Sequence, residues 1–234
     1  MGKVISKFLV EMYNGRPTIK MLDRSSSQTE SVVVIESDSL ADNVKQILSY
    51  VYDECRGFYE GYAPVRHGKH WGYVDVTLNE VVTPFYDYAF SVQEGFALVE
   101  EGNKYKFLKM FDSCVPIPYN GSDFDGASSF CNGMARVERD GLHGYISNTN
   151  HLMEEIPCQY EAAFDFDLKH PYAVVMIHGK YGMIDKSGDE VVPPLFDTYT
   201  PRVRSSGSLS YNATIGDKLY MLKADGTYKE VVSK

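Results

Sequence analysis

Histidine is the residue type in this chain whose spacing comes nearest to a metal site. His67 and His70 stand three residues apart in one predicted turn, and His143 and His178 occupy related turns further along the chain. A metal site needs three or four converging ligands that are held by further hydrogen bonds, whereas this spacing supplies two. Solvated turn histidines are therefore the favoured interpretation, and the sequence predicts no metal and no other cofactor.

Cysteine offers the second possible chemistry, nucleophilic catalysis. The chain has four scattered cysteines: Cys55, Cys114, Cys131 and Cys158. No two of them have the close spacing of a zinc site, and they are expected to be reduced thiols of a cytoplasmic protein. Cys131 or Cys158 could act as a nucleophile beside His143 or His151, but no known catalytic motif surrounds them. We therefore expect a protein that is not an enzyme and keep a hydrolase or transferase as an alternative.

An arginine pair is the third candidate. Arg202 and Arg204 precede a Ser/Gly-rich loop that departs from the pattern of the rest of the chain. Paired guanidinium groups can bind an anionic group, and long loops in compact proteins often carry function. Together with Tyr199 and Tyr211, the two arginines form the predicted site for a ligand or partner. A surface loop that binds nothing is the competing interpretation.

Several aspartates recur at equivalent places and could suggest paired catalytic acids. They are Asp75 and Asp185 within the motifs, with Asp87 and Asp197 at the motif ends. A catalytic acid should occur once in an array of repeats, whereas acids that cap backbone N–H groups at turns should occur in every copy. The recurrence therefore indicates a structural role.

The composition describes an ordinary globular chain. Its 234 residues are 44% hydrophobic and 24% charged, with a formal net charge of −9. An acidic chain without a basic run is a poor partner for nucleic acid, because phosphate binding depends on clustered lysine and arginine. No apolar run approaches the length of a membrane span, and the first ten residues do not resemble a signal peptide. We expect one folded domain in the cytoplasm, bound to neither membrane nor nucleic acid.

The elements that must position any site are repeats. Alanines recur at intervals of 34, 38, 38 and 40 residues, each followed two positions later by Val or Ile: Ala63, Ala97, Ala135, Ala173 and Ala213. Residues 63–87 laid on 173–197 match at nine of 25 positions without a gap. We therefore expect repeats that begin near Phe58, Phe90, Phe130, Phe166 and Val203, and a degenerate repeat over residues 1–36.

Within each repeat the apolar residues alternate as they do in strands. Gly-x-Ala-x-Val predicts a first strand, residues 71–76 or 181–186 a second, and residues 80–85 or 190–195 a third. A repeat of three short strands exposes one face and must stack on its neighbours. The sequence thus predicts a mainly all-β protein of tandem hairpins in an open, curved array, with a closed, propeller-like ring as the alternative.

One segment, residues 37–57, breaks the strand pattern. Between Ser39 and Arg56 the apolar residues fall on one helical face, Ser39 could cap the N-terminal end, and Gly57 could stop the helix. We expect an amphipathic helix inserted here. It would either cap an exposed sheet or dock a partner.

These motifs resemble the WG repeat family of bacterial β-rich arrays. The resemblance covers roughly residues 58–232 and is carried by Trp71-Gly72-Tyr73-Val74-Asp75, by Tyr181-Gly182-Met183-Ile184-Asp185 and, more weakly, by His143-Gly144-Tyr145-Ile146. It implies an interaction scaffold, often in bacterial or phage-linked settings, without established catalytic residues. We expect Gly72, Gly144 and Gly182 to permit close packing between repeats.

The sequence as a whole favours a non-enzymatic scaffold that binds a protein partner. A binder of a small anionic ligand, such as a nucleotide or sugar near Arg202 and Arg204, is the first alternative, and an uncharacterised hydrolase is the second. A deep pocket with those arginines would favour the first alternative. His, Cys or Asp side chains converging from different repeats would favour the second.

Overall fold

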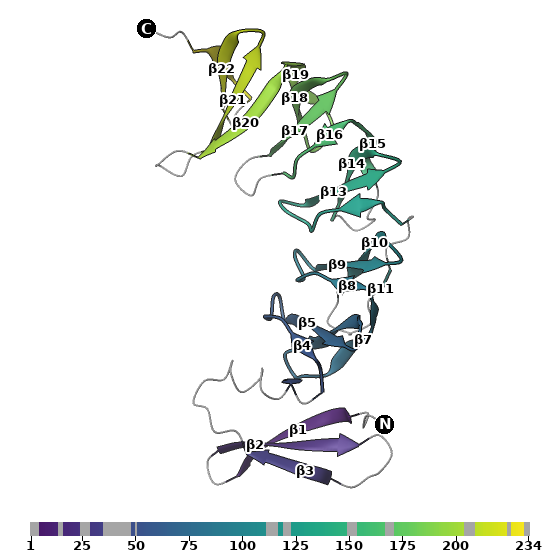
Figure 1. Cartoon of the computed structure of the whole chain (residues 1–234). Helices are drawn as coiled ribbons and strands as arrows, with labels where there is room; N and C mark the ends of the chain where they lie inside the picture. The colour runs from purple at the N-terminus through teal and green to yellow at the C-terminus, as the bar shows by residue number, and fades with distance from the viewer. Residues whose placement is uncertain are drawn as a thin grey trace. The chain divides into compact units, whose positions relative to one another are not determined.

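The computed structural model describes residues 5–13, 16–23, 29–34, 48–49, 51–110, 117–118, 123–148, 154–166, 171–203, 209–223 and 226–231 (Figure 1). The chain divides into two compact units. The first comprises Met1–Gly102 and Lys106–Pro118, and the second comprises Asn103–Tyr105 and Tyr119–Lys234. In the part of the chain described, no helix has the length and apolar character needed to cross a bilayer.

Every described sheet is antiparallel, and its strands are neighbours in chain order. The first sheet has three strands: β1 (Ile5–Tyr13), β2 (Arg16–Asp23) and β3 (Thr29–Val34). The next has four: β4 (Glu54–Cys55), β5 (Tyr62–His67), β6 (His70–Asp75) and β7 (Glu80–Tyr86). The third has β8 (Tyr88–Ala89), β9 (Phe96–Glu101), β10 (Lys104–Lys109) and β11 (Ile117–Pro118).

Three further four-stranded sheets follow. One has β12 (Gly126–Ala127), β13 (Met134–Arg139), β14 (Leu142–Ser147) and β15 (Glu154–Tyr160). The next has β16 (Ala162–Ala163), β17 (Tyr172–Ile177), β18 (Lys180–Asp185) and β19 (Glu190–Phe196). The last described sheet has β20 (Thr198–Val203), β21 (Leu209–Ile215), β22 (Lys218–Lys223) and β23 (Tyr228–Glu230).

The all-β prediction is confirmed, but the number of strands in a repeat was underestimated. Each of the five later sheets has four strands where the sequence predicted three. The missed strand comes first in its sheet and is only two residues long in β4, β8, β12 and β16. Two residues carry no periodicity, so the alternation of apolar side chains could not reveal them.

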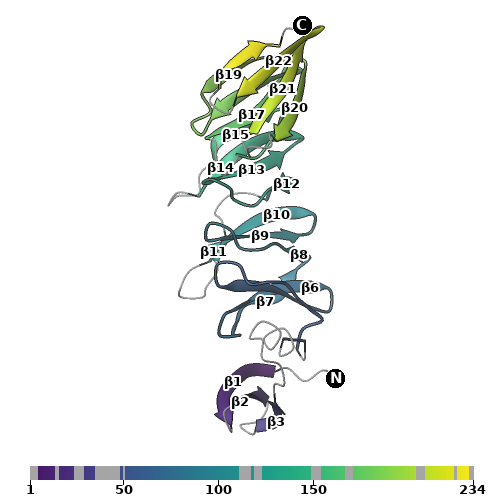
Figure 2. The same ribbon diagram turned by 90° about the vertical axis from the view of Figure 1, so that its left-hand side faces the viewer.

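Stacked sheets bury both of their faces in each unit. In the second unit, Ile184 of β18 packs toward β12–β15, while its neighbour Met183 packs toward β20–β23. Successive side chains of a strand point to opposite faces, so one strand serves two cores. Figure 2 shows the strands of β16–β19 and β20–β23 side by side. In the described residues, the sheets of each unit follow in tandem and neither unit closes into a ring by itself.

The inserted helix ends earlier than the sequence predicted. Leu48 and Ser49 are helical, and the amide of Tyr52 donates to the Leu48 carbonyl at 2.8 Å. Glu54–Cys55, however, is strand β4, because Cys55 pairs with Val65 of β5. Tertiary pairing thus overrides the helical pattern at this end, and residues 37–47 and 50 of the predicted helical segment lie outside the described residues.

The described end of this segment covers a sheet face. Leu48 is fully buried and Tyr52 nearly so, and both pack against Ala63 and Val65 of β5 and Val74 of β6. The Tyr52 hydroxyl also donates to Glu80 Oε2 at 3.1 Å. These contacts agree with the capping role rather than with a helix that keeps its apolar face for a partner.

The three motif glycines permit a close approach of two strands. A Cβ atom built at these positions would lie 2.2, 2.5 and 2.6 Å from a backbone oxygen of the next strand: Gly72 meets Val82, Gly144 meets Ile156 and Gly182 meets Val192. The register of each strand pair shifts beside the glycine. The expectation of close packing between repeats was wrong, because the contact lies within one sheet, between its third and fourth strands.

Substitution of Gly182 by Ala should therefore destabilise the fold. The new Cβ would meet backbone that cannot rotate away, and overpacking of this kind typically costs about 1–3 kcal/mol. We expect a fall of several degrees in the melting temperature, measured by circular dichroism. Gly57→Ala is the control, because a Cβ there meets only a Tyr59 ring carbon at 3.6 Å. Equal melting of the two variants would contradict this explanation.

An acidic side chain at the start of each four-stranded sheet holds the turn of the hairpin that follows. The carboxylate accepts a turn N–H at 2.6 to 2.9 Å in all five sheets: Asp53 from Gly68, Asp87 from Gly102, Asp125 from Asp140, Glu161 from Gly179 and Asp197 from Gly216. Asp75 and Asp185 cap a second turn, where their Oδ1 atoms accept the amides of Thr77 and Ser187 at 2.8 and 2.9 Å. The repeated acidic side chains therefore accept hydrogen bonds from backbone N–H groups and stabilise the turns.

Two of these carboxyls also make ion pairs, which should give the second unit a pH-dependent stability. The pKa of Asp125 is lowered by its hydrogen bond with Lys104 and then by the Asp140 amide, and the pKa of Asp197 is lowered by Lys180 and then by the Gly216 amide. Because the folded pKa is depressed, the contribution is complete above the unfolded pKa of about 4 and is lost as the pH falls through the folded value.

Replacing both Asp125 and Asp197 by Asn should flatten this pH dependence. Asn can still accept the turn N–H, but it has no carboxylate to protonate. We expect the urea midpoint of the double variant to fall less than that of the wild type between about pH 5 and pH 2. Parallel curves for the two proteins would show that these carboxyls do not carry the acid sensitivity.

Candidate functional site

The two tyrosines of the predicted site lie together. Tyr199 of β20 and Tyr211 of β21 have ring centroids 4.9 Å apart and planes inclined by 33°. Tyr211 is 5% exposed and belongs to the core, whereas Tyr199 is half-buried. Arg202 lies in β20 with its backbone opposite Ser210. The side chain of Arg202, and all of Arg204, lie outside the described residues.

Two aromatic side chains that the sequence did not single out extend this pair. Phe164, the residue after β16, has its ring centroid 5.2 Å from that of Tyr199, and Tyr181 of β18 lies 6.0 Å from Tyr199. Phe164 is 44% exposed and Tyr181 is half-buried. We call Phe164, Tyr181, Tyr199 and Tyr211 the aromatic patch. Tyr181 begins a repeat motif, but nothing in the sequence indicates that Phe164 meets a tyrosine 35 residues later.

The first unit has an equivalent aromatic cluster, and an arginine side chain of the same unit packs against its rings. Trp71 is the repeat counterpart of Tyr181, and Arg56 follows β4 as Phe164 follows β16. The Arg56 guanidinium carbon lies 3.9 Å from the centroid of the Trp71 ring and 4.4 Å from that of Tyr88, within the range of cation–π attraction. Arg56 also donates to the Ala89 carbonyl at 2.9 Å. In this unit the chain supplies its own cation for the aromatic rings.

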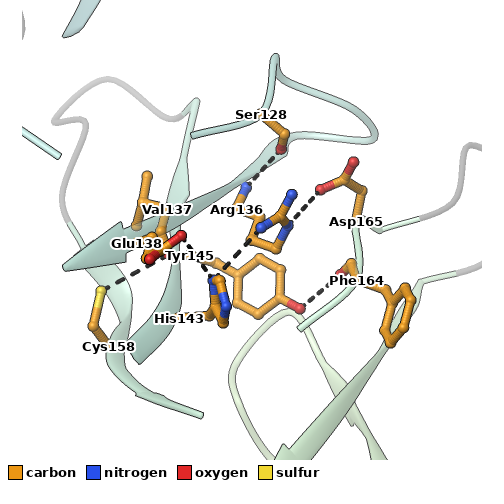
Figure 3. A network of polar contacts seen from close by, with 9 residues as sticks. All are labelled: Ser128, Arg136, Val137, Glu138, His143, Tyr145, Cys158, Phe164 and Asp165. Atoms are coloured by element: carbon orange, nitrogen blue, oxygen red, sulfur yellow. Dashed lines mark hydrogen bonds and ion pairs between the residues drawn. The ribbon is translucent and has the colours of Figure 1, made fainter. Parts of the chain in front are cut away.

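Histidine stands at the same repeat position in β14, within a polar network (Figure 3). Arg136 Nη1 lies 3.5 Å from His143 Nδ1, and Arg136 Nε donates to Asp165 Oδ1 at 3.1 Å. Glu138 Oε2 lies 4.0 Å from His143 Nδ1. Burial, followed by the charge of Arg136, lowers the pKa of His143, and Glu138 opposes them in part. His143 is therefore neutral at neutral pH.

The network joins two sheets through Tyr145. Its hydroxyl donates to the Phe164 carbonyl at 2.7 Å, which fixes the backbone that carries Phe164 of the aromatic patch (Figure 3). Burial raises the pKa of Tyr145, so the hydroxyl remains a donor. In the first unit, Tyr73 makes the same bond to the Phe90 carbonyl at 2.6 Å. Buried tyrosines thus position the residues at the edge of the next sheet.

The cysteine and histidine candidates do not form a nucleophile–base pair in the described contacts. Cys158 Sγ donates weakly to the Val137 carbonyl at 4.0 Å, and His143 faces Arg136 and Glu138 (Figure 3). Asp165 pairs with Arg136 rather than with the imidazole. His151 and Cys114 lie outside the described residues. In these described contacts His143 interacts with charged side chains and Cys158 with a backbone carbonyl.

The predicted turn histidines, His67 and His70, face each other across the β5–β6 hairpin. His67 Nδ1 lies 3.3 Å from the Val51 carbonyl oxygen, so the ring donates to backbone. Throughout the described ranges, no group of three His, Cys, Asp or Glu side chains is placed to hold a metal ion.

A cavity of about 180 Å³ lies in the second unit, beside Gly182. Apolar side chains of β17 and β18 form much of its wall, among them Val175, Ile177 and Ile184, and Tyr160 and Glu190 also line it.

This architecture defines a class of protein, an all-β array of small antiparallel sheets in tandem. Solved structures that are similar to the chain include Kluyveromyces lactis Hsv2 with its complete loop 6CD, at 11% identity and a TM-score of 0.44, covering 93% of this chain and 70% of that one. Selenomethionine-substituted virginiamycin B lyase from Staphylococcus aureus is similar at 14% identity and a TM-score of 0.35, covering 75% and 68%. None of the curated proteins matches the chain.

The particular family follows from the repeat itself. The WG containing repeat matches residues 45–69, 71–105, 144–181 and 181–201, about half of the chain. The chain belongs to this family. The match begins earlier and ends earlier than the resemblance over residues 58–232. Strands β21–β23 lie beyond the match, yet they still form a four-stranded sheet with β20.

The pKa of His143 offers a test of the network. We expect its titration midpoint, followed by NMR of the imidazole, to lie below the ordinary value of about 6.5. Arg136→Met should raise the midpoint because it removes a neighbouring positive charge, whereas Glu138→Gln should lower it further. Since the native pKa is depressed, stability from this group is present above about pH 6.5 and is lost as the pH falls. Shifts of the same sign in both variants would refute this arrangement.

Proposed function

We propose that this chain is a non-enzymatic scaffold that binds a protein partner in the cytoplasm, and that the aromatic patch is part of its contact surface. The observation that carries this proposal is the exposure of Phe164, 44%, beside two half-buried tyrosines. Aromatic side chains with one face packed and one face exposed are typical anchors of protein interfaces, because they bury a large area at a small loss of conformational freedom.

The comparison of the two units supports the same conclusion. In the first unit Arg56 covers the ring of Trp71 and is itself fixed by the Ala89 carbonyl. In the second unit a phenylalanine occupies the place of that arginine, so the chain presents an apolar ring at its surface instead of a charge. A position that varies in this way within a constant framework is suited to recognition.

The net charge of the chain restricts the kinds of partner that it can bind. A formal net charge of −9 repels polyanions and favours neutral or basic protein surfaces. The competing hypothesis, a small anionic ligand at Arg202 and Arg204, predicts that a metabolite remains on the purified protein. Mass spectrometry of the undigested protein under native conditions tests that hypothesis directly.

The scaffold proposal is tested by affinity capture from cytosol of the source organism, with wild-type and substituted proteins as baits. Phe164→Ala combined with Tyr181→Ala should reduce partner recovery at least about tenfold, as expected for loss of a hot spot. Phe85→Ala is the matched control, because Phe85 is 59% exposed and lies outside the patch. Arg202→Ala with Arg204→Ala reports on the neighbouring loop.

Recovery of the same protein partner by all baits would exclude the aromatic patch as the interface. A small metabolite bound to the wild type, together with no enriched protein, would overturn the scaffold proposal. Circular dichroism of each bait separates loss of binding from loss of folding.

A further inference from the structure

The cavity beside Gly182 has a chemistry of its own. Its walls include the apolar side chains of Val175, Ile177 and Ile184, and one carboxylate residue, Glu190, lines it. Val175 and Ile184 are buried, whereas Glu190 is exposed to solvent. The cavity thus combines an apolar interior with an acidic group that reaches water.

The corresponding place in the first unit has different side chains. Gly188 is the counterpart of Leu78, and both residues have positive φ, 85° and 64°. The Leu78 side chain is buried in the core cluster of Ala63, Val65 and Val74, where it fills the corresponding place. In the second unit Gly188 lines the cavity without a side chain of its own, and the side chain of Ile156 lies 3.4 Å from the position that a Cβ at Gly188 would take.

The repeat also shows that the two carboxylates differ in their partners. Glu80, the counterpart of Glu190, accepts the Tyr52 hydroxyl at 3.1 Å and the Thr83 hydroxyl at 2.9 Å. The counterpart of Thr83 is Pro193, which has no hydroxyl. From the described residues, the Glu190 carboxylate accepts no hydrogen bond and joins no ion pair. Burial is the main cause that raises the pKa of Tyr160, and the charge of Glu190 adds to it, which places the carboxylate near that phenol.

We propose that this cavity binds a lysine side chain of a protein partner, with the ammonium group at Glu190. A lysine can lay its four methylene groups along an apolar surface while its charged head stays near water, which is the arrangement that these walls and this carboxylate offer. The net charge of −9 favours the approach of such a basic partner. An arginine would need a carboxylate held for bidentate contact, and Glu190 is exposed.

This inference rests on the proposed scaffold function, but its test addresses a different surface. Phe164 and Tyr181 of the aromatic patch do not line the cavity. A peptide that binds at the cavity is therefore informative even if the aromatic patch proves inactive, and loss of capture by the Phe164 variant does not bear on the cavity.

The probe is a pair of peptides, acetyl-Gly-Lys-Gly-amide and acetyl-Gly-norleucine-Gly-amide, which differ by the ammonium group. Each is titrated to millimolar concentration into the isotope-labelled full chain, and the amide signals of Gly182, Gly188 and Glu190 are followed by NMR. We expect saturable shifts of these signals with the lysine peptide and weaker or no shifts with norleucine.

Substitution of Glu190 provides the second part of this test. Glu190→Gln keeps the shape and removes the charge, and it should weaken the lysine peptide about two- to fivefold, as expected for one partly exposed ion pair. Glu80→Gln, the matched change at the filled site, should leave the titration unchanged. Both variants should keep the wild-type pattern of amide signals elsewhere.

Three results would overturn the proposal. An equal response to norleucine would show an apolar site without selection for a cation, and full binding by the Glu190→Gln variant would remove the carboxylate from recognition. Absence of any shift in these amides would show that the cavity does not bind the side chain. A stronger response to the corresponding arginine peptide would overturn the assignment to lysine.

Discussion

The closest backbone contact in each motif, between the glycine of the third strand and the fourth strand, is the constraint on which the rest depends. At Gly72, Gly144 and Gly182 there is no room for a side chain, because the carbonyl of the fourth strand occupies its place. The register shifts there, so the fourth strand bends across the third. The residue before each glycine is thereby fixed near the hairpin end of an inner strand, where Trp71, His143 and Tyr181 lie.

Around this constant framework the position before the glycine serves a different purpose in each repeat. Trp71 stacks with an arginine, His143 lies beside Arg136 in a network of charges, and Tyr181 joins an aromatic patch. The turn-capping acids and the buried tyrosines recur, whereas the side chains before the glycines do not. Stability is thus carried by the residues that repeat, and the residues that vary are available for the recognition that we propose.

The sequence predicted the features that repetition makes visible. Alternating Ala and Val gave the strand hairpins, and the recurrence of Asp75 and Asp185 indicated backbone contacts instead of catalysis. Features decided by tertiary pairing were missed: β4 replaced the end of a helix because Cys55 meets Val65, and the two-residue first strands have no period. Phe164 was missed for a related reason. It joins the aromatic patch through its contact with Tyr199, and the two residues come together only when the chain folds.

The order of the strands has a consequence for biosynthesis. Every hydrogen-bonded strand pair described joins segments that are consecutive in the chain. None of the described sheets has to wait for a distant segment, so each can form once its own few dozen residues have left the ribosome, and the next can then add to a finished surface. Contacts of such low sequence separation are associated with rapid folding. A nascent chain of this kind can pair each new strand with the preceding one, and that limits the time for which unpaired strands are exposed to aggregation during translation.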